Sequence, residues 1–97
     1  MKAWPFDQSP NTVTLTTRFV LEGKEEIRVA VHQSDDHSWQ FLCGTTERAE
    51  DARVIAMHEA LAMDSSLSTI ADLLPGWSAW RESKGAEWHR ERDESDG

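Results

Sequence analysis

Two short stretches of alternating side chains, on either side of an acidic turn, constrain the fold of this chain more than any other feature. Before the turn, apolar residues occupy every second position from Ile27 to Val31. After the turn, Trp39 and Phe41 alternate with Gln40 and Leu42. A period of two is typical of half-buried strands, and the intervening residues 35–38 are turn formers. The pattern therefore predicts an antiparallel hairpin.

Strands are also expected near both ends of the chain. Residues 12–17 are rich in Thr and Val and predict a strand, after which Thr17 can cap one helical turn through Leu21. Residues 77–82 predict another strand, with Trp77 and Ala79 on one face and Trp80 on the other. A turn over residues 83–86 and a return strand over residues 87–90 complete a second hairpin.

The middle of the chain has helical spacing. Residues 51–64 place apolar side chains three and four positions apart, although residues 54–56 could instead be a short strand feeding a helix that begins near Met57. Asp64 can cap a second short helix that ends at Pro75-Gly76. Its apolar face is expected to comprise Leu67, Ile70, Ala71 and Leu74.

These elements predict an α+β fold, with a mostly antiparallel sheet from N-terminal and C-terminal hairpins and two short helices in the middle. The expected single domain covers residues 12–90. Residues 1–11 form an arm with two prolines that we expect Trp4 and Phe6 to pin to the domain. Residues 91–97 are charged and lack apolar side chains, which predicts a disordered tail.

The charge of the chain limits its partners. Eighteen acidic and ten basic residues give a formal net charge of -8 over 97 residues. This charge repels phosphate backbones and anionic lipids, so we expect no nucleic-acid or membrane partner, whereas a basic protein would be attracted. No apolar run reaches membrane-spanning length and the N-terminus lacks an apolar signal region, so we expect a cytoplasmic protein.

No motif in the sequence indicates catalysis or a cofactor. Cys43 is the single cysteine and is expected to be a small buried side chain. His58-Glu59 begins like a zinc-protease motif, but Ala62 stands where the second histidine is needed. We therefore expect a protein that binds another macromolecule, with no enzymatic activity and no cofactor.

Two groups of residues are candidates for binding. Indoles dominate the energetics of many protein interfaces, so Trp39, Trp77 and Trp80 are candidate contacts for a protein partner if they are exposed. The alternative is a small-ligand or divalent-metal site around the acidic turn. Its candidate ligands are His32, Asp35, Asp36 and His37.

The order of several segments resembles a bacterial family of small domains of unknown function, grouped with predicted immunity proteins of polymorphic toxin systems. The resemblance covers about residues 12 to 90 and departs from the family pattern at Ser38, where a glycine typically precedes the tryptophan. The matching segments are residues 17–20 with Glu22-Gly23, residues 36–44, Leu61 with residues 64–67, and residues 74–82.

The family pattern carries no catalytic residues to transfer to this chain. Membership would imply a cytoplasmic, non-enzymatic protein more than it would imply any mechanism. An immunity protein works by occluding the active site of a toxin, and a housekeeping binding role stays open beside it. An acidic surface suits a basic nuclease toxin, so the resemblance and the net charge imply the same class of partner.

Overall fold

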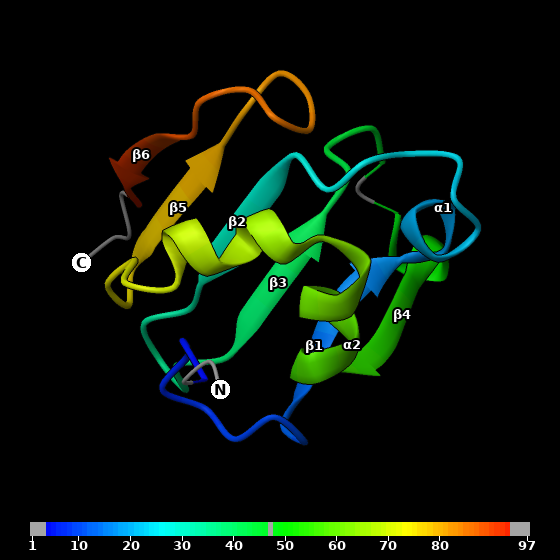
Figure 1. The fold of residues 1–97 in the computed structure, drawn as a ribbon. Helices are drawn as coiled ribbons and strands as arrows, with labels where there is room; N and C mark the ends of the chain where they lie inside the picture. Colours follow the sequence, from blue (N-terminus) through cyan, green and yellow to red (C-terminus); the bar gives the residue numbers. More distant parts are fainter. Residues whose placement is uncertain (1–3, 47, 94–97) are drawn as a thin grey trace.

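The computed structural model describes residues 4–46 and 48–93, which form a six-stranded sheet with short helices packed on one side (Figure 1). The 3₁₀ helices are named η1 and η2. In chain order the elements are β1 (Val13–Thr17), α1 (Arg18–Leu21), β2 (Val29–His32), β3 (Trp39–Leu42), η1 (Ala49–Asp51), β4 (Ala52–Ala56), α2 (Met57–Met63), η2 (Ser65–Ile70), β5 (Trp77–Trp80) and β6 (His89–Arg92).

The sheet has the strand order β4-β1-β3-β2-β5-β6. β1 pairs with β3 in parallel, with Leu15 opposite Gln40, and the other neighbouring strands pair antiparallel. The sheet is therefore mostly antiparallel, and the α+β class predicted from the sequence is confirmed.

The two interpretations of residues 54–56 are resolved in favour of a strand. These residues lie in β4, and α2 begins at Met57.

Asp64 caps the next helix by accepting a hydrogen bond from the Ser66 amide at 3.0 Å. That helix, η2, ends at Ile70, so its periodicity does not continue to Leu74, which is 62% exposed. Leu73 is buried in its place, and the prediction for Leu74 is wrong.

The C-terminal strand lies two residues later than predicted. β6 places His89 opposite Trp80 and Arg92 opposite Trp77. The next residue, Asp93, accepts a hydrogen bond of 2.6 Å from the Ser78 hydroxyl. The predicted disorder is therefore wrong for residues 91–93, because strand pairing and this hydrogen bond hold them, while residues 94–97 lie outside the described part of the chain.

Aromatic contacts hold the N-terminal arm against the core. Phe6 is 5% exposed and lies edge-on to Trp39, with ring centroids 5.2 Å apart. Trp4 packs on Phe6 at 5.7 Å, and its Nε1 donates to the carbonyl oxygen of Gln8. These contacts confirm that Trp4 and Phe6 pin the arm, of which residues 1–3 lie outside the described residues.

The core lies between the helices and one face of the sheet. In Figure 1, α2 and η2 cross in front of the strands, and their buried side chains include Met57, Ala60, Leu67 and Ile70. β2 contributes Ala30 and His32 to this side, paired with Phe41 and Trp39 of β3. Val29 and Val31 point to the other face, because side chains alternate along a strand.

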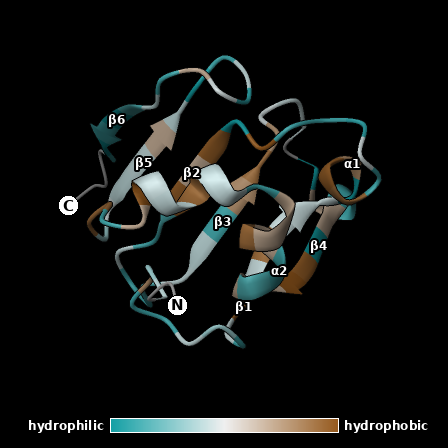
Figure 2. Ribbon diagram, viewed as in Figure 1, coloured by the Kyte–Doolittle hydropathy of each residue, from teal (hydrophilic) through white to brown (hydrophobic). Residues whose placement is uncertain are grey.

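The two edge strands differ in chemistry, as Figure 2 shows by the brown of β4 and the teal of β6. All four residues of β6 are exposed, and three of them are charged. β4 is largely apolar, but the Arg53 guanidinium donates to the carbonyl oxygens of Glu50 and Ala52 at 2.9 and 2.8 Å. Charge therefore marks both edges of the sheet.

Candidate partner-binding surface

The three candidate indoles occupy different environments. Trp39 is 2% exposed and stacks on His32 at 4.2 Å and on Phe41 at 5.6 Å. Its Nε1 donates to the side-chain oxygen of Gln8 at 2.9 Å. Trp39 is therefore a core residue, and the prediction that it contacts a partner is wrong, because a buried indole presents no surface.

Trp77 and Trp80 lie on opposite faces of β5. Trp77 is half-buried and packs against the core. Trp80 is 43% exposed, and its ring lies 4.5 Å from that of His89. Trp80 is therefore available for contact with another molecule.

The four residues of the candidate metal site point in different directions. His32 is 2% exposed, and its Nδ1 lies 2.7 Å from the carbonyl oxygen of Leu73. Asp36 lies in the exposed turn, where hydrogen bonding first to the side chain and then to the amide of Ser38 lowers the pKa of Asp36. Asp35 accepts from the Asp36 amide, and the His37 ring centroid lies 6.0 Å from that of His32.

The turn therefore uses its carboxylates to bind backbone amides, while His32 faces the core. Within residues 4–46 and 48–93, no three or more His, Cys, Asp or Glu side chains lie close enough to hold a metal ion. The structure does not bring the predicted ligands together.

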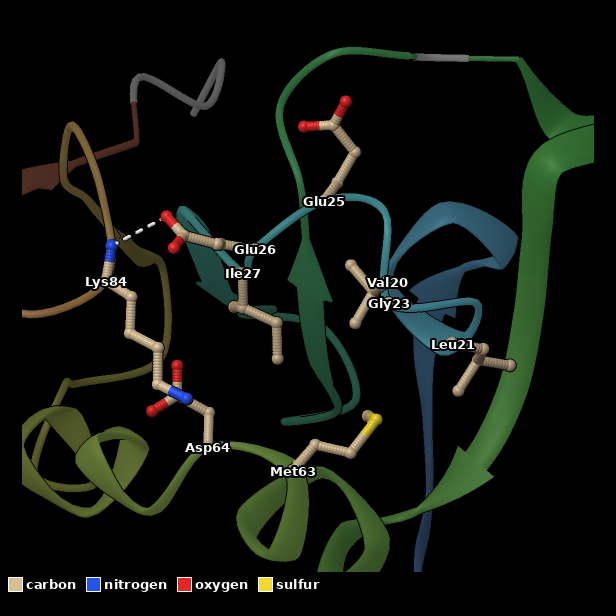
Figure 3. A pocket seen from close by; sticks show the side chains of 9 residues that line it. All are labelled: Val20, Leu21, Gly23, Glu25, Glu26, Ile27, Met63, Asp64 and Lys84. Carbon is tan, nitrogen blue, oxygen red and sulfur yellow. Dashed lines mark hydrogen bonds between the residues drawn. The ribbon is translucent and has the colours of Figure 1, made fainter.

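A cavity of about 350 Å³ lies between the α1–β2 connection, the end of α2 and the loop after β5 (Figure 3). Val20 and Ile27 are buried at its base, and Leu21 and Met63 are 43% and 37% exposed at its wall. Glu25, Glu26, Asp64 and Lys84 add polar groups. We name this feature the acidic pocket.

Two adjacent carboxylates stand at the mouth of the acidic pocket. Glu25 forms an ion pair of 3.1 Å with Arg28. Glu26 accepts a hydrogen bond of 2.9 Å from the backbone amide of Lys84, which joins the α1–β2 connection to the loop after β5. Figure 3 shows the Lys84 side chain extending from this point toward Asp64. An apolar base below these carboxylates suits a long cationic side chain.

Asp64, which lines the acidic pocket, belongs to a buried ion pair. Arg81 Nη2 lies 2.6 Å from Asp64 Oδ2, and the two side chains are 1% and 5% exposed. Arg81 also donates to the Ile27 carbonyl and the Ser66 hydroxyl, and its guanidinium lies 4.2 Å over the Trp88 ring. Burial alone would raise the pKa of Asp64, but hydrogen bonds from Ser66 and Arg81 and the charge of Arg81 outweigh it and lower that pKa.

Ion pairing on the described surface leaves carboxylates in excess. Arg18, Lys24, Arg28, Arg48 and Arg90 each pair with an acidic residue near the surface. The acidic residues of the described part of the chain that are exposed and lie in no such pair are Asp7, Glu26, Asp35, Asp36, Glu59, Glu82, Glu87 and Glu91. The negative net charge is therefore displayed to solvent.

Cys43 is 1% exposed, which confirms its expected burial. Burial raises the pKa of this thiol, but hydrogen bonds with the hydroxyls of Thr17 and Thr45 outweigh this effect and lower that pKa. Their S–O distances are 3.4 and 3.1 Å. The thiol therefore belongs to the packing between β1 and β3.

Sequence reasoning missed the acidic pocket. Its apolar residues come from three separate segments, and only tertiary packing brings Ile27 beside Met63. The adjacent carboxylates Glu25 and Glu26 are the signal that the sequence offers, but acidic neighbours of this kind are also common in ordinary polar turns.

No helix within the described residues is long and apolar enough to cross a membrane. Comparisons with family models, curated proteins and solved structures found no match to this chain.

Proposed function

We propose that this protein is a non-catalytic binding domain whose acidic pocket receives a basic side chain of a protein partner. The observation that carries the proposal is the apolar base of Val20, Ile27 and Met63 beneath the adjacent carboxylates Glu25 and Glu26. A Lys or Arg side chain can lay its methylene groups on such a base while its charge meets the carboxylates.

The charges around the pocket favour this occupant over an anionic one. Glu26 lies in no ion pair among the described residues, and the net charge of -8 attracts a basic protein from a distance. The resemblance to predicted immunity proteins leads us to propose a toxin as the partner. Support for this class of partner would be a basic toxin encoded in the neighbouring reading frame that co-purifies with this protein.

A peptide titration tests the pocket directly. A capped peptide of alternating Lys and Leu is added to the isotope-labelled protein, and NMR shifts are followed at Val20, Ile27 and Met63. We expect saturable shifts at these residues, which weaken as salt is added because the attraction is electrostatic. A peptide of alternating Glu and Leu should leave them unchanged.

Two matched variants identify the carboxylate that acts. Glu26→Gln keeps an oxygen that accepts from the Lys84 amide but removes the charge, so the Kd for the Lys/Leu peptide should rise about threefold. Glu91→Gln removes the same charge from the exposed strand β6 and should leave the Kd unchanged. Shifts that avoid the pocket, or an equal loss in both variants, would contradict the proposal.

A further inference from the structure

Each carboxylate at the mouth of the acidic pocket already uses one of its two oxygens. Glu26 Oε1 accepts the hydrogen bond of 2.9 Å from the backbone amide of Lys84, and Glu25 Oε1 accepts one of 3.1 Å from Arg28 Nη1. Within residues 4–46 and 48–93, no hydrogen bond reaches the second oxygen, Oε2, of either side chain. Each carboxylate therefore offers an incoming cation one oxygen that is free of hydrogen bonds.

The carboxylates of the acidic pocket do not combine into a wider acceptor. Figure 3 shows the side chains of Glu25 and Glu26 turned to different sides of the α1–β2 connection. The third carboxylate that lines the pocket, Asp64, is fully engaged. Its Oδ1 accepts from the amide and hydroxyl of Ser66, and its Oδ2 accepts from Arg81. A cationic group in the pocket therefore meets one free carboxylate oxygen at a time.

Lysine and arginine differ in what they need from a carboxylate. A guanidinium is a planar fork whose two parallel N–H groups are best satisfied by both oxygens of one carboxylate, whereas an ammonium is a compact point charge that needs only one. Glu26 is exposed, so an ammonium beside it keeps water on its remaining N–H groups. The apolar base of Val20, Ile27 and Met63 can accommodate the methylene groups of the lysine.

We infer that the acidic pocket selects lysine over arginine in the protein partner. This inference rests on the proposed function and names the chemical class of the occupant. Arg28 and the Lys84 amide determine the preference, because each occupies the oxygen that the second prong of a guanidinium would need. Arginine can bind through one hydrogen bond in place of two, so it loses the advantage that bidentate contact gives it elsewhere.

A matched pair of peptides tests the preference. The capped Lys/Leu peptide and a capped peptide of alternating Arg and Leu are titrated separately into the labelled protein, and NMR shifts at Val20, Ile27 and Met63 give a Kd for each. We expect the Kd of the Arg/Leu peptide to be about fivefold higher. Equal Kd values, or a lower value for the Arg/Leu peptide, would overturn lysine selection and leave the proposed function standing. Unchanged spectra at these residues with both peptides would overturn the proposed function as well.

Arg28→Met identifies the origin of the preference. It frees both oxygens of Glu25, while the backbone hydrogen bonds of residue 28 to Leu42 and Arg81 need no side chain. Removing a positive charge should strengthen the binding of both peptides, so the measurement is the ratio of their two Kd values. We expect this ratio to fall from about fivefold to about one, because the guanidinium fork can then bind both oxygens of Glu25.

Arg48→Met is the matched control. Arg48 pairs with Glu50 at 2.7 Å, so this variant also removes a positive charge and frees a carboxylate, but neither residue lines the acidic pocket. The ratio should stay at about fivefold. Circular dichroism melts confirm that each variant is folded, and the comparison of peptides on the unchanged protein stands if Arg28→Met unfolds. A ratio that Arg28→Met leaves unaltered, or that Arg48→Met lowers equally, would overturn the assignment of the preference to Arg28.

Discussion

Arg81 and Asp64 form an ion pair in the interior, with 2.6 Å between Nη2 and Oδ2, and this pair joins β5's end to the start of η2. Removing one partner of a buried pair leaves an uncompensated charge. Asp64→Asn keeps an oxygen to cap η2 but loses the charge, so the free energy of unfolding should fall by about 3 kcal/mol. Urea denaturation of Asp64→Asn and of the unchanged protein measures this difference in the free energy of unfolding.

The exposed pair Arg90–Asp72 is the control for that prediction. Its side chains are 37% and 78% exposed, so solvent screens their attraction. Asp72→Asn should change the free energy of unfolding by less than about 1 kcal/mol. Equal losses in the two variants would show that burial of the Asp64 pair has no energetic consequence.

Acid should weaken the fold partly through Asp64. The folded state lowers the pKa of Asp64 below its ordinary value of 3.8, so the unfolded chain binds its proton more readily. The contribution of ionised Asp64 to the free energy of unfolding is fully present above its ordinary pKa of 3.8 and is lost as the pH falls through its lowered pKa in the folded state. Urea denaturation between pH 6 and pH 3 should therefore show a shallower decline in Asp64→Asn than in the unchanged protein. Parallel declines would contradict this assignment.

Phe6 should contribute to stability although it precedes the first strand. It is 5% exposed against Trp39 and Phe41, so Phe6→Ala should reduce the free energy of unfolding by about 3 kcal/mol through lost burial and an unfilled space. Leu74→Ala, at a residue that is 62% exposed, should change it by less than about 0.5 kcal/mol. Urea denaturation of both variants provides the comparison.

Gly44 and Gly23 separate backbone strain from side-chain crowding. Both have positive φ, 78° and 75°, so an alanine at either position should cost about 1 kcal/mol. A Cβ at Gly44 would also lie 3.3 Å from Val29 Cγ2, whereas a Cβ at Gly23 meets no described atom within 4 Å. Thermal melts should rank Gly44→Ala as the less stable variant, and the opposite order would refute the crowding argument.

Lys84 should compete with a basic partner for the acidic pocket. Lys84→Met keeps a long apolar side chain but removes the positive charge, so the Kd for the Lys/Leu peptide should fall about threefold. Arg92→Met removes a positive charge from β6 and should not change that Kd. Unaltered binding after Lys84→Met, measured by the same NMR titration, would count against competition.

Local patterns predicted the strand segments well but did not identify the helix-covered face. The alternation around Ile27 to Val31 predicts a strand without saying which row of side chains the helices cover, and the covered row is Ala30 and His32. Both rows of β2 side chains can be buried, so alternation alone could not decide between them. The position of the helices determines which row of β2 side chains is buried, and that position depends on contacts between distant segments.

The candidate site was less predictable than the fold. The parallel pairing of Leu15 with Gln40 joins residues 25 positions apart, and no local pattern signals it. It nevertheless brings Leu15 and Gln40 together in the lining of a hollow of about 260 Å³. The burial of Trp39 likewise depends on Phe6 and Gln8 in the arm, which a strand pattern does not include.

The chemistry of the sheet edges has a consequence for aggregation. A bare edge strand is a template on which further chains can add and grow into fibrils. The Arg53 guanidinium already engages two carbonyl groups at the start of β4, and successive charges along β6 would oppose each other in a growing ribbon. Edge-to-edge association in the plane of the sheet is thereby disfavoured. This is the mode of association in which further chains can add without limit.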